Sequence, residues 1–271
     1  MKLVLPCKNT VILYQIVTYI MESNFKMVAK TLYGLEDLLA KELRQLGASG
    51  IEKGTRNVAF EGDTGFMYKA NLCCRTAIKI LKPITAFNVF TEEDIYKIKW
   101  EDYMEANGSL AVDATVFSKQ FTHSQYVALK TKDAIVDRFR DKEGVRPDVD
   151  LDHPTLRINV HIDRNICTVS LDSSGQSLHK RGYKTASTIA PINEVLAAGM
   201  VMLSGWEGQC NFMDPMCGSG TILTEAAMIA CNIPPNLNRD EFGFETWPDF
   251  DIDLFEIIEN AALKKNKRLP F

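Results

Sequence analysis

The chain has 271 residues, a formal net charge of −4 and a hydrophobic fraction of 46%. This length predicts two domains or three small ones, and the composition is ordinary for a globular protein. No stretch approaches 18 uninterrupted apolar residues, so the sequence predicts no membrane-spanning helix. Residues 1–190 carry a net charge of +3 and residues 191–271 a net charge of −7. An anionic polymer is therefore expected to meet the first part of the chain.

Residues 1–24 are predicted to be an extension in front of the folded protein. The apolar run 11–21 resembles a secretory signal, but Gln15 interrupts it and no small-x-small cleavage site precedes Glu22. The simpler interpretation is that translation starts at Met21 and that residues 1–20 are artefactual or disordered. A secretory signal is the alternative.

The cysteines predict reduced, mostly buried thiols. There are seven, an odd number, with no Cys-x-x-Cys pair and no metal-ligand spacing with the four histidines. This pattern predicts no metal site and a cytoplasmic location.

The first elements predict a small α+β layer. Residues 25–31 form a short strand-like run, and leucines then recur at helical spacing over residues 35–46 until Gly47 ends the helix. Residues 56–62 alternate as a strand does. Strand, helix and strand in this order resemble half of a ferredoxin-like unit.

The middle of the chain predicts a second layer of strands and helices. A helix is expected over residues 66–81, ended by Pro83. The elements that follow are a short helix with an acidic first turn at 91–94, a strand at 110–117, a helix at 124–142, a loop at 144–154, and a hairpin of strands 156–162 and 166–171. Lys130 and Lys132 on the long helix are candidate RNA contacts, although acidic neighbours also fit a solvated face.

The segment 177–184 is the strongest candidate for contact with nucleic acid. It contains one aromatic residue, Tyr183, among four residues with a basic or imidazole side chain. These are His179, Lys180, Arg181 and Lys184. Basic groups grip phosphates and a tyrosine stacks on an unpaired base. A linker between domains is the alternative, and the two roles are compatible. A helix over residues 191–203, with Pro191 in its first turn, is expected to follow.

The most informative motif lies at residues 214–221. It joins an apolar run, residues 210–213, to a helix-forming run, residues 222–231, and so predicts a strand, a tight glycine loop and a helix. Glycines let the backbone pass close to a ligand, and the helix N-terminus presents free N–H groups at the same place. The candidate binding residues are Asp214, Pro215, Cys217, Gly218, Ser219, Gly220 and Thr221.

Two common glycine-loop functions do not fit this motif. A phosphate-binding P-loop requires lysine after its second glycine, whereas Gly220 is followed by Thr221. A dinucleotide fingerprint requires a third glycine at the position of Leu223. An acidic residue followed by Cys-Gly-Ser-Gly-Thr resembles motif I of class I S-adenosylmethionine (SAM) methyltransferases. An ordinary strand-to-helix turn is the alternative. Cys217 is a small packing residue or, less simply, a reactive thiol.

The order of these motifs resembles the bacterial 23S rRNA guanine-N2 methyltransferases that carry a THUMP domain. The resemblance covers nearly all of residues 25–250. It rests on the segments 34–39, 130–137, 171–175, 181–184, 190–194, 214–221 and 242–247.

This resemblance implies the fold and the domains. Residues 25–65 would form a ferredoxin-like subdomain and residues 66–177 a THUMP domain that docks structured RNA, both α+β. Residues 178–271 would begin an α/β Rossmann-like methyltransferase domain. The implied cofactor is SAM, with Asp214, Gly218, Ser219 and Gly220 at its methionine end. The implied partner is 23S rRNA or a pre-50S particle, and no membrane or metal is implied.

The sequence departs from the family at the catalytic motif. The family uses Asn-Pro-Pro-Tyr to hold the guanine amine and stack on the flipped base, and neither this motif nor Asp-Pro-Pro-Tyr occurs here. Residues 233–236, Ile-Pro-Pro-Asn, more simply end the preceding helix. We therefore expect a C-terminally truncated chain that is inactive alone. The alternatives are a non-catalytic RNA-binding protein and a methyltransferase that acts on tRNA, DNA or protein.

Overall fold

The computed structural model of the protein describes residues 24–184 and 191–268. The predicted extension, apart from residue 24, lies outside the described residues, and so do residues 185–190. Among the helices that are described, none combines the length and the apolar character needed to cross a membrane.

One mixed sheet of eight strands runs through the molecule in the order β2-β3-β1-β4-β8-β7-β5-β6. Neighbouring strands are antiparallel except for β5, which is parallel to both β6 and β7. The strands are β1 (Phe25–Lys30), β2 (Ser49–Lys53), β3 (Asn57–Gly62), β4 (Lys79–Phe87), β5 (Ser109–Phe117), β6 (Asp148–Val149), β7 (Leu156–Asp163) and β8 (Ile166–Asp172).

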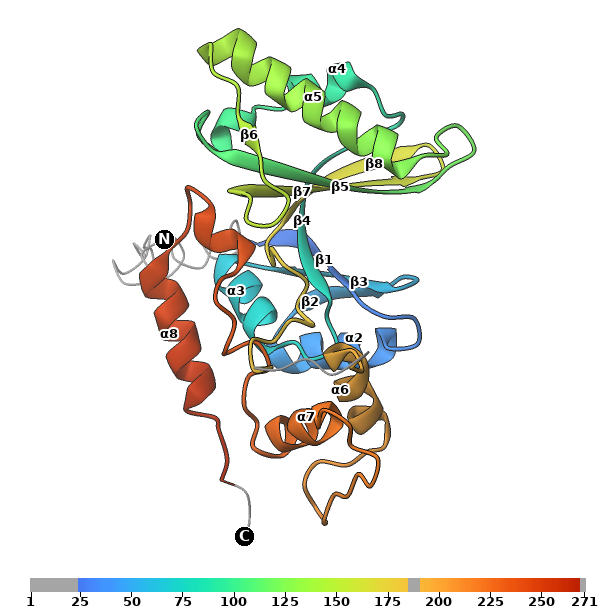
Figure 1. The fold of residues 1–271 in the computed structure, drawn as a ribbon, viewed down its shortest axis with the longest axis vertical. Helices are drawn as coiled ribbons and strands as arrows, with labels where there is room; N and C mark the ends of the chain where they lie inside the picture. The colour runs from blue at the N-terminus through green and yellow to red at the C-terminus, as the bar shows by residue number, and fades with distance from the viewer. Residues whose placement is uncertain (1–23, 185–190, 269–271) are drawn as a thin grey trace, which may run out of the picture.

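Two groups of helices pack on two different halves of the sheet (Figure 1). Helices α2 and α3 pack on β1–β4, which gives a complete βαββαβ unit, and α4 and α5 cover the half that contains β5, β7 and β8. The C-terminal helices lie beside the first half, and α8 packs on α3. The helices are α2 (Glu36–Leu46), α3 (Thr64–Cys73), α4 (Glu92–Lys97), η1 (Trp100–Asp102), α5 (Ser124–Glu143), α6 (Glu194–Leu203), α7 (Thr221–Ala230), η2 (Gly243–Thr246) and α8 (Ile252–Leu263).

Most of the predicted elements are present with small changes at their ends. The expected strands and helices of residues 25–62, 91–142 and 156–171 correspond to β1, α2, β3, α4, β5, α5, β7 and β8. Gly47 ends α2 with a φ of 110°, in the left-handed region that favours glycine. The strands β2 and β6 were not predicted, because their residues are largely exposed and show no apolar alternation.

The prediction of one helix over residues 66–81 is wrong in its second half. Helix α3 ends at Cys73, and β4 begins at Lys79. The buried carboxylate of Glu42 on α2 accepts hydrogen bonds from the N–H groups of Arg75 (2.8 Å) and Thr76 (3.0 Å), which turns the chain out of the helix. Pro83 lies inside β4 at a register shift, a position that tolerates its missing N–H.

Strand β4 joins the two halves of the molecule. Its first residues pair with β1, and the stretch from Leu81 to Phe87 pairs with β8. One cluster of buried hydrophobic residues includes Met27 and Phe60 in the first half and Ile135 and Val160 in the second. The halves therefore share a continuous core.

The segment that follows α7 returns to this core through aromatic side chains. The ring of Phe244 stacks on that of Tyr68 in α3, with centroids 4.4 Å apart, and Phe255 packs edge-on against both. Such pairs add about 0.5–1.5 kcal/mol each beyond the area that they bury. Residues 242–255 are thus anchored on the first half of the molecule.

Residues 191–268 contain helices and turns but no strand. The predicted strand at 210–213 is therefore wrong in this structure, because no neighbouring strand in the described residues offers hydrogen bonds to it. Met213 is 85% exposed. Pro191 precedes α6 rather than lying in its first turn, and Asn193 caps the helix through its side chain.

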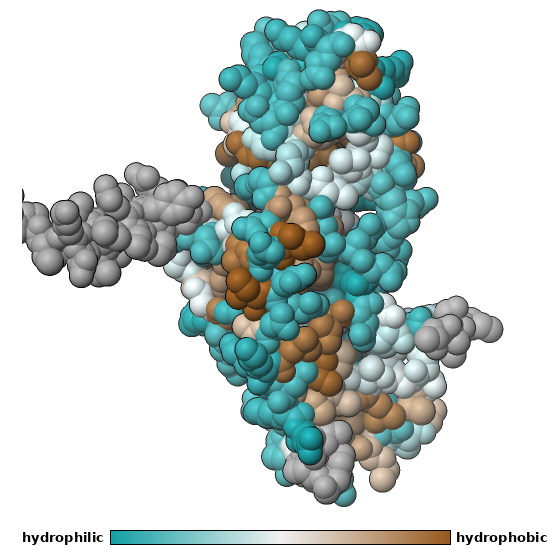
Figure 2. Space-filling model, turned by 90° about the vertical axis from the view of Figure 1, so that its left-hand side faces the viewer, coloured by the Kyte–Doolittle hydropathy of each residue, from teal (hydrophilic) through white to brown (hydrophobic). Residues whose placement is uncertain are grey.

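Apolar side chains remain exposed on these C-terminal helices. Leu203 on α6 is 63% exposed and Ile257 on α8 is 65% exposed. Figure 2, which looks onto the side that carries α8, shows apolar surface grouped across the middle and lower parts and mostly polar surface at the upper end.

Candidate functional site

The predicted binding loop leads directly into α7. The side chain of Asp214 accepts a hydrogen bond from the N–H of Met216 (3.0 Å), and the N–H of Gly220 donates to the carbonyl of Cys217 (2.7 Å). Pro215, Cys217, Gly218 and Ser219 are exposed, whereas Thr221 is buried at the start of the helix. The structure thus brings the predicted residues together on one exposed turn.

The loop leaves room for a ligand close to its backbone. Gly218 and Gly220 have φ values of 52° and 72°, and a Cβ added at either would meet no atom within 4 Å. Helix α7 has no side-chain cap, so its first N–H groups are free to bind a polar group. These residues fit the polar, anionic end of an amino-acid-bearing cofactor. Cys217 is exposed in this structure, which differs from the expectation of a small packing residue.

Arg181 does not lie at the surface, contrary to the prediction that it contacts RNA. Its side chain is 1% exposed, and its Nε lies 3.3 Å from Oε1 of Glu225 in α7. The guanidinium also donates to the carbonyls of Leu178 (3.2 Å) and Arg75 (2.7 Å) and to the amide oxygen of Asn236 (3.1 Å). Each of its three nitrogens donates inside the protein, so the RNA contact is not retained for Arg181.

Tyr183 and Lys184 also turn inward. The hydroxyl of Tyr183 donates to the same Glu225 oxygen (3.0 Å), and Lys184 pairs with Glu194 at the start of α6 (2.6 Å). Burial raises the pKa of Glu225, and the nearby Arg181 guanidinium opposes that rise. Burial is the main cause that raises the pKa of Tyr183 above its ordinary value, and the negative charge of Glu225 raises it further. The segment thus ties the sheet to both helices that flank the glycine loop.

The other predicted RNA contacts lie apart from one another. Lys180 is exposed, and its ammonium donates only to Gln176 (3.2 Å) among the described residues. Lys130 pairs with Glu92 (3.0 Å) and Lys132 with Asp133 (2.6 Å) on the half that carries α5. These lysines therefore do not form one cluster with residues 180–184.

Three residues of the buried network were not singled out from the sequence. Arg75 donates to the carbonyls of Met228 (3.2 Å) and Ile233 (2.7 Å), and the amide of Asn236 donates to the carbonyl of Asn71 (2.7 Å). These bonds join α3 and the turn after it to α7 and the turn after that helix, across more than 150 residues of sequence, and Glu225 adds the contact to Arg181. A charged residue in an otherwise apolar helix, as at Glu225, is the one signal that could have indicated such a role.

The network makes a pH-dependent prediction for Tyr183. Replacing Tyr183 with phenylalanine is expected to lower the free energy of unfolding by about 1–2 kcal/mol at pH 8, because the ionised Glu225 loses a donor. The raised pKa of Glu225 means that its ionisation costs stability as pH rises through that pKa. Burial holds the pKa of Glu225 above its ordinary value, so the loss in Tyr183→Phe is expected to shrink toward about pH 4, which lies below that ordinary value. Urea unfolding at both pH values measures it, and an equal loss at both would contradict it.

Within residues 24–184 and 191–268, no group of three or more histidine, cysteine or acidic side chains could hold a metal ion. The six cysteines in these ranges are all free thiols.

Three known families match successive parts of the chain. An RlmL ferredoxin-like domain matches residues 26–81, a THUMP domain matches residues 91–172, and an RMKL-like methyltransferase domain matches residues 181–270. The domain limits at residues 65 and 177 stay predictions.

Curated relatives are longer than this chain. It is 38% identical over 256 residues to a protein from Syntrophotalea carbinolica named ribosomal RNA large subunit methyltransferase K/L, which covers 91% of the chain and 36% of that relative. The namesake from Aeromonas hydrophila is 42% identical over 239 residues, with 87% and 33% covered. The chain thus spans about a third of the length of these two relatives.

Solved structures share the fold over most of the chain. One, described as a methyltransferase complexed with S-adenosylhomocysteine (SAH), has a TM-score of 0.76 at 31% identity and covers 90% of this chain and 66% of its own. Another, from Listeria monocytogenes and described as a predicted N6-adenine-specific DNA methylase, has a TM-score of 0.79 at 30% identity, with 93% and 67% covered.

Proposed function

Because the chain belongs to the family of methyltransferases that join an RlmL-type ferredoxin-like domain, a THUMP domain and an RMKL-like methyltransferase domain, we propose that it docks structured RNA for methylation by SAM. The observation that carries this proposal is the open glycine loop at the start of α7, which a buried network ties to the turn between α3 and β4. A fixed geometry between docking surface and cofactor is what methyl transfer requires, since catalysis by positioning fails with small displacements.

The glycine loop would hold the methionine end of the cofactor. Asp214, Gly218, Ser219 and Gly220 offer a carboxylate, a hydroxyl, free N–H groups and a backbone without Cβ interference. When bound, SAM supplies an electrophilic methyl group on its sulfonium centre. The residues of this chain would bind and orient it.

The proposed substrate is the N2 amine of a guanine in 23S rRNA, free or in a pre-50S particle. The names of the curated relatives support the large ribosomal subunit, and the positive balance of the first part of the chain supports a polyanion. Free thiols support a cytoplasmic location. Because Asn-Pro-Pro-Tyr does not occur in the chain, we propose that these 271 residues do not transfer a methyl group by themselves.

A non-catalytic RNA-binding role is the second candidate, and the missing tetrapeptide is the observation that favours it. Incubation of the purified chain with labelled SAM and 23S rRNA separates the cases. No transfer is expected from the chain alone, and transfer is expected once the remainder of a relative's methyltransferase domain is joined to it. Transfer by the chain alone would contradict the proposed inactivity.

The RNA preference is tested by binding. A gel-shift comparison of a 23S rRNA fragment with tRNA at low salt is expected to show tighter binding of the rRNA. Preference for tRNA would move the proposal to a tRNA methyltransferase, and no shift of either RNA would contradict RNA docking.

The cofactor loop is tested with one substitution. In the chain joined to the remainder of a relative's domain, Asp214→Asn is expected to weaken SAH binding about tenfold, which corresponds to about 1.4 kcal/mol. Calorimetry measures the affinity, and Asp253→Asn on the exposed side of α8 is the matched control. Equal affinities for the two variants would contradict the role of Asp214.

A further inference from the structure

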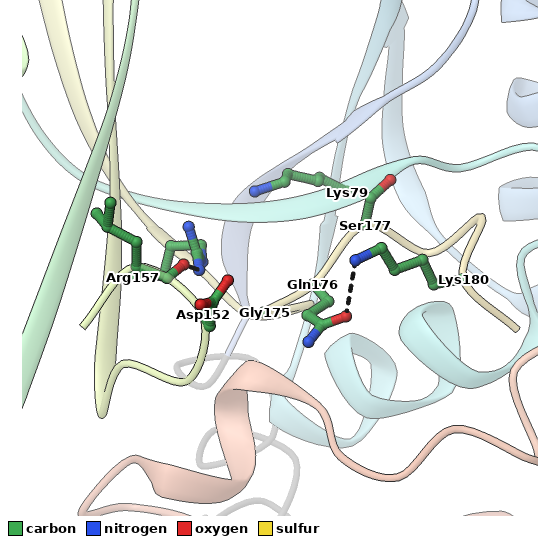
Figure 3. A pocket seen from close by; sticks show the side chains of 8 residues that line it. Lys79, Asp152, Arg157, Gly175, Gln176, Ser177 and Lys180 are labelled. Carbon is green, nitrogen blue, oxygen red and sulfur yellow. Dashed lines mark hydrogen bonds between the residues drawn. The ribbon is translucent and has the colours of Figure 1, made fainter. Parts of the chain in front are cut away.

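A pocket of about 250 Å³ lies where the two halves of the molecule meet, away from the glycine loop. It is lined by Lys79 on β4, Arg157 on β7, and residues of the loops that precede β7 and follow β8 (Figure 3). In Figure 3, Lys79, Arg157 and Lys180 approach the pocket from different elements. The full lining is Lys79, Leu151, Asp152, Arg157, Gly175, Gln176, Ser177 and Lys180.

The charges of the pocket favour an anion. Three cationic side chains line it against one carboxylate, that of Asp152. Lys79 pairs with buried Asp172 (2.5 Å), and both Lys79 (3.3 Å) and Arg157 (3.4 Å) lie near Asp113. Asp172 and Asp113 thus offset Lys79 and Arg157, whereas the ammonium of Lys180 has no carboxylate partner among the described residues and is available to an anion.

Two further nitrogen groups that can donate hydrogen bonds belong to this cluster or lie beside it, on Arg157 and Lys30. The Nε of Arg157 is buried and has no hydrogen-bond acceptor in the part of the chain that the structure describes. Lys30 binds Asn159 (3.2 Å) beside the cluster, and burial together with the charge of Lys79 lowers its pKa.

The loop that forms one wall of the pocket is held rigidly. The guanidinium of Arg239 donates to four carbonyls of this loop, those of Ser174 (3.2 Å), Gln176 (3.0 Å), Ser177 (3.1 Å) and Lys180 (2.6 Å). Burial lowers the pKa of Arg239 to about 10, so it stays charged at neutral pH. A wall that is ordered before binding reduces the entropy lost when a ligand binds.

The size and lining point to a single phosphate group. The volume lies below the range of about 300–1,000 Å³ that is typical of small-molecule sites. No aromatic side chain lines the pocket, so it offers no surface on which a base could stack. Lysine and arginine donors are the groups that bind phosphate oxygens.

We propose that this pocket binds one backbone phosphate of the RNA that the protein docks, an inference that rests on the proposed function. The phosphate would lie between the two halves of the sheet and contact Lys180, the neighbour of Arg181, whose guanidinium contacts Glu225 in α7. It would therefore fix the RNA relative to the glycine loop.

The test uses the full 271-residue chain and a fluorescent 23S rRNA fragment, with affinity measured by anisotropy at several salt concentrations. Lys180→Gln is expected to weaken binding about fivefold and to reduce the slope of log affinity against log salt by about 1. Asp152→Asn removes the one carboxylate of the lining and is expected to strengthen binding about twofold. A folding defect would weaken both variants, so opposite signs identify an electrostatic effect.

Lys41→Gln, at an exposed lysine on α2, is the matched control. If the wild type bound RNA and the Lys180→Gln and Lys41→Gln variants had the same affinity and the same salt slope, the proposed phosphate site would be wrong, whereas the proposal of RNA docking would stand. Absence of RNA binding by the wild type would overturn the proposed function together with the pocket. Inorganic phosphate is the second probe. If phosphate binding depended on Lys180 but RNA affinity did not, the pocket would be a site for a free anion, and this result would overturn the proposal.

Discussion

Replacing Arg181 with alanine is expected to lower the free energy of unfolding by about 3–5 kcal/mol, the usual cost of removing one partner of a buried ion pair. The substitution leaves the carboxylate of Glu225, which is fully buried, without its counter-charge. It also leaves the carbonyls of Leu178 and Arg75 without their donor. The expected loss comes mainly from these unsatisfied groups and less from the attraction itself.

Urea unfolding followed by circular dichroism measures this loss, and Lys180→Ala, at the exposed neighbouring position, is the matched control. The control is expected to stay within about 0.5 kcal/mol of the wild type. Arg181→Lys is expected to recover little, because a lysine cannot direct donors to Glu225, Asn236 and two carbonyls together. If Arg181→Ala were as stable as the wild type and bound RNA more weakly, Arg181 would be a surface contact, as the sequence predicted.

Gly182→Ala is expected to cost about 2–5 kcal/mol. Gly182 has a φ of 82°, and an added Cβ would lie 1.8 Å from the carbonyl oxygen of Asn238. Backbone atoms cannot move aside as a flexible side chain can, so the steric cost adds to about 1–2 kcal/mol for a left-handed conformation. This glycine is therefore required for the close approach of the segment 180–184 to residues 236–239.

Gly205→Ala separates the two contributions. Gly205 has a φ of 72°, and its added Cβ would meet nothing within 4 Å, so only the conformational cost of about 1–2 kcal/mol is expected. The two variants are compared by the same unfolding measurement. Equal losses would show that the contact with Asn238 contributes nothing.

Local patterns predicted much of the fold because they are set by neighbouring residues. The leucine spacing of α2, its glycine C-cap and the alternation in β3 were all visible in the sequence. Predictions failed where distant residues decide. The carboxylate of Glu42 ends α3, and pairing with both β1 and β8 makes β4 a strand around Pro83. Residues 210–213 have strand-like composition, yet a strand exists only with a partner to accept its hydrogen bonds.

The candidate site divides in the same way. Spacing and residue type by themselves determined the glycine loop of residues 214–221, because a helix start, an acidic residue and two glycines act locally. The roles of the basic segment were decided only by the tertiary structure. Composition does not distinguish an arginine that faces a polyanion from one that faces a buried carboxylate, and the packing of α7 places Glu225 beside Arg181 while Lys180, one residue earlier, faces the pocket.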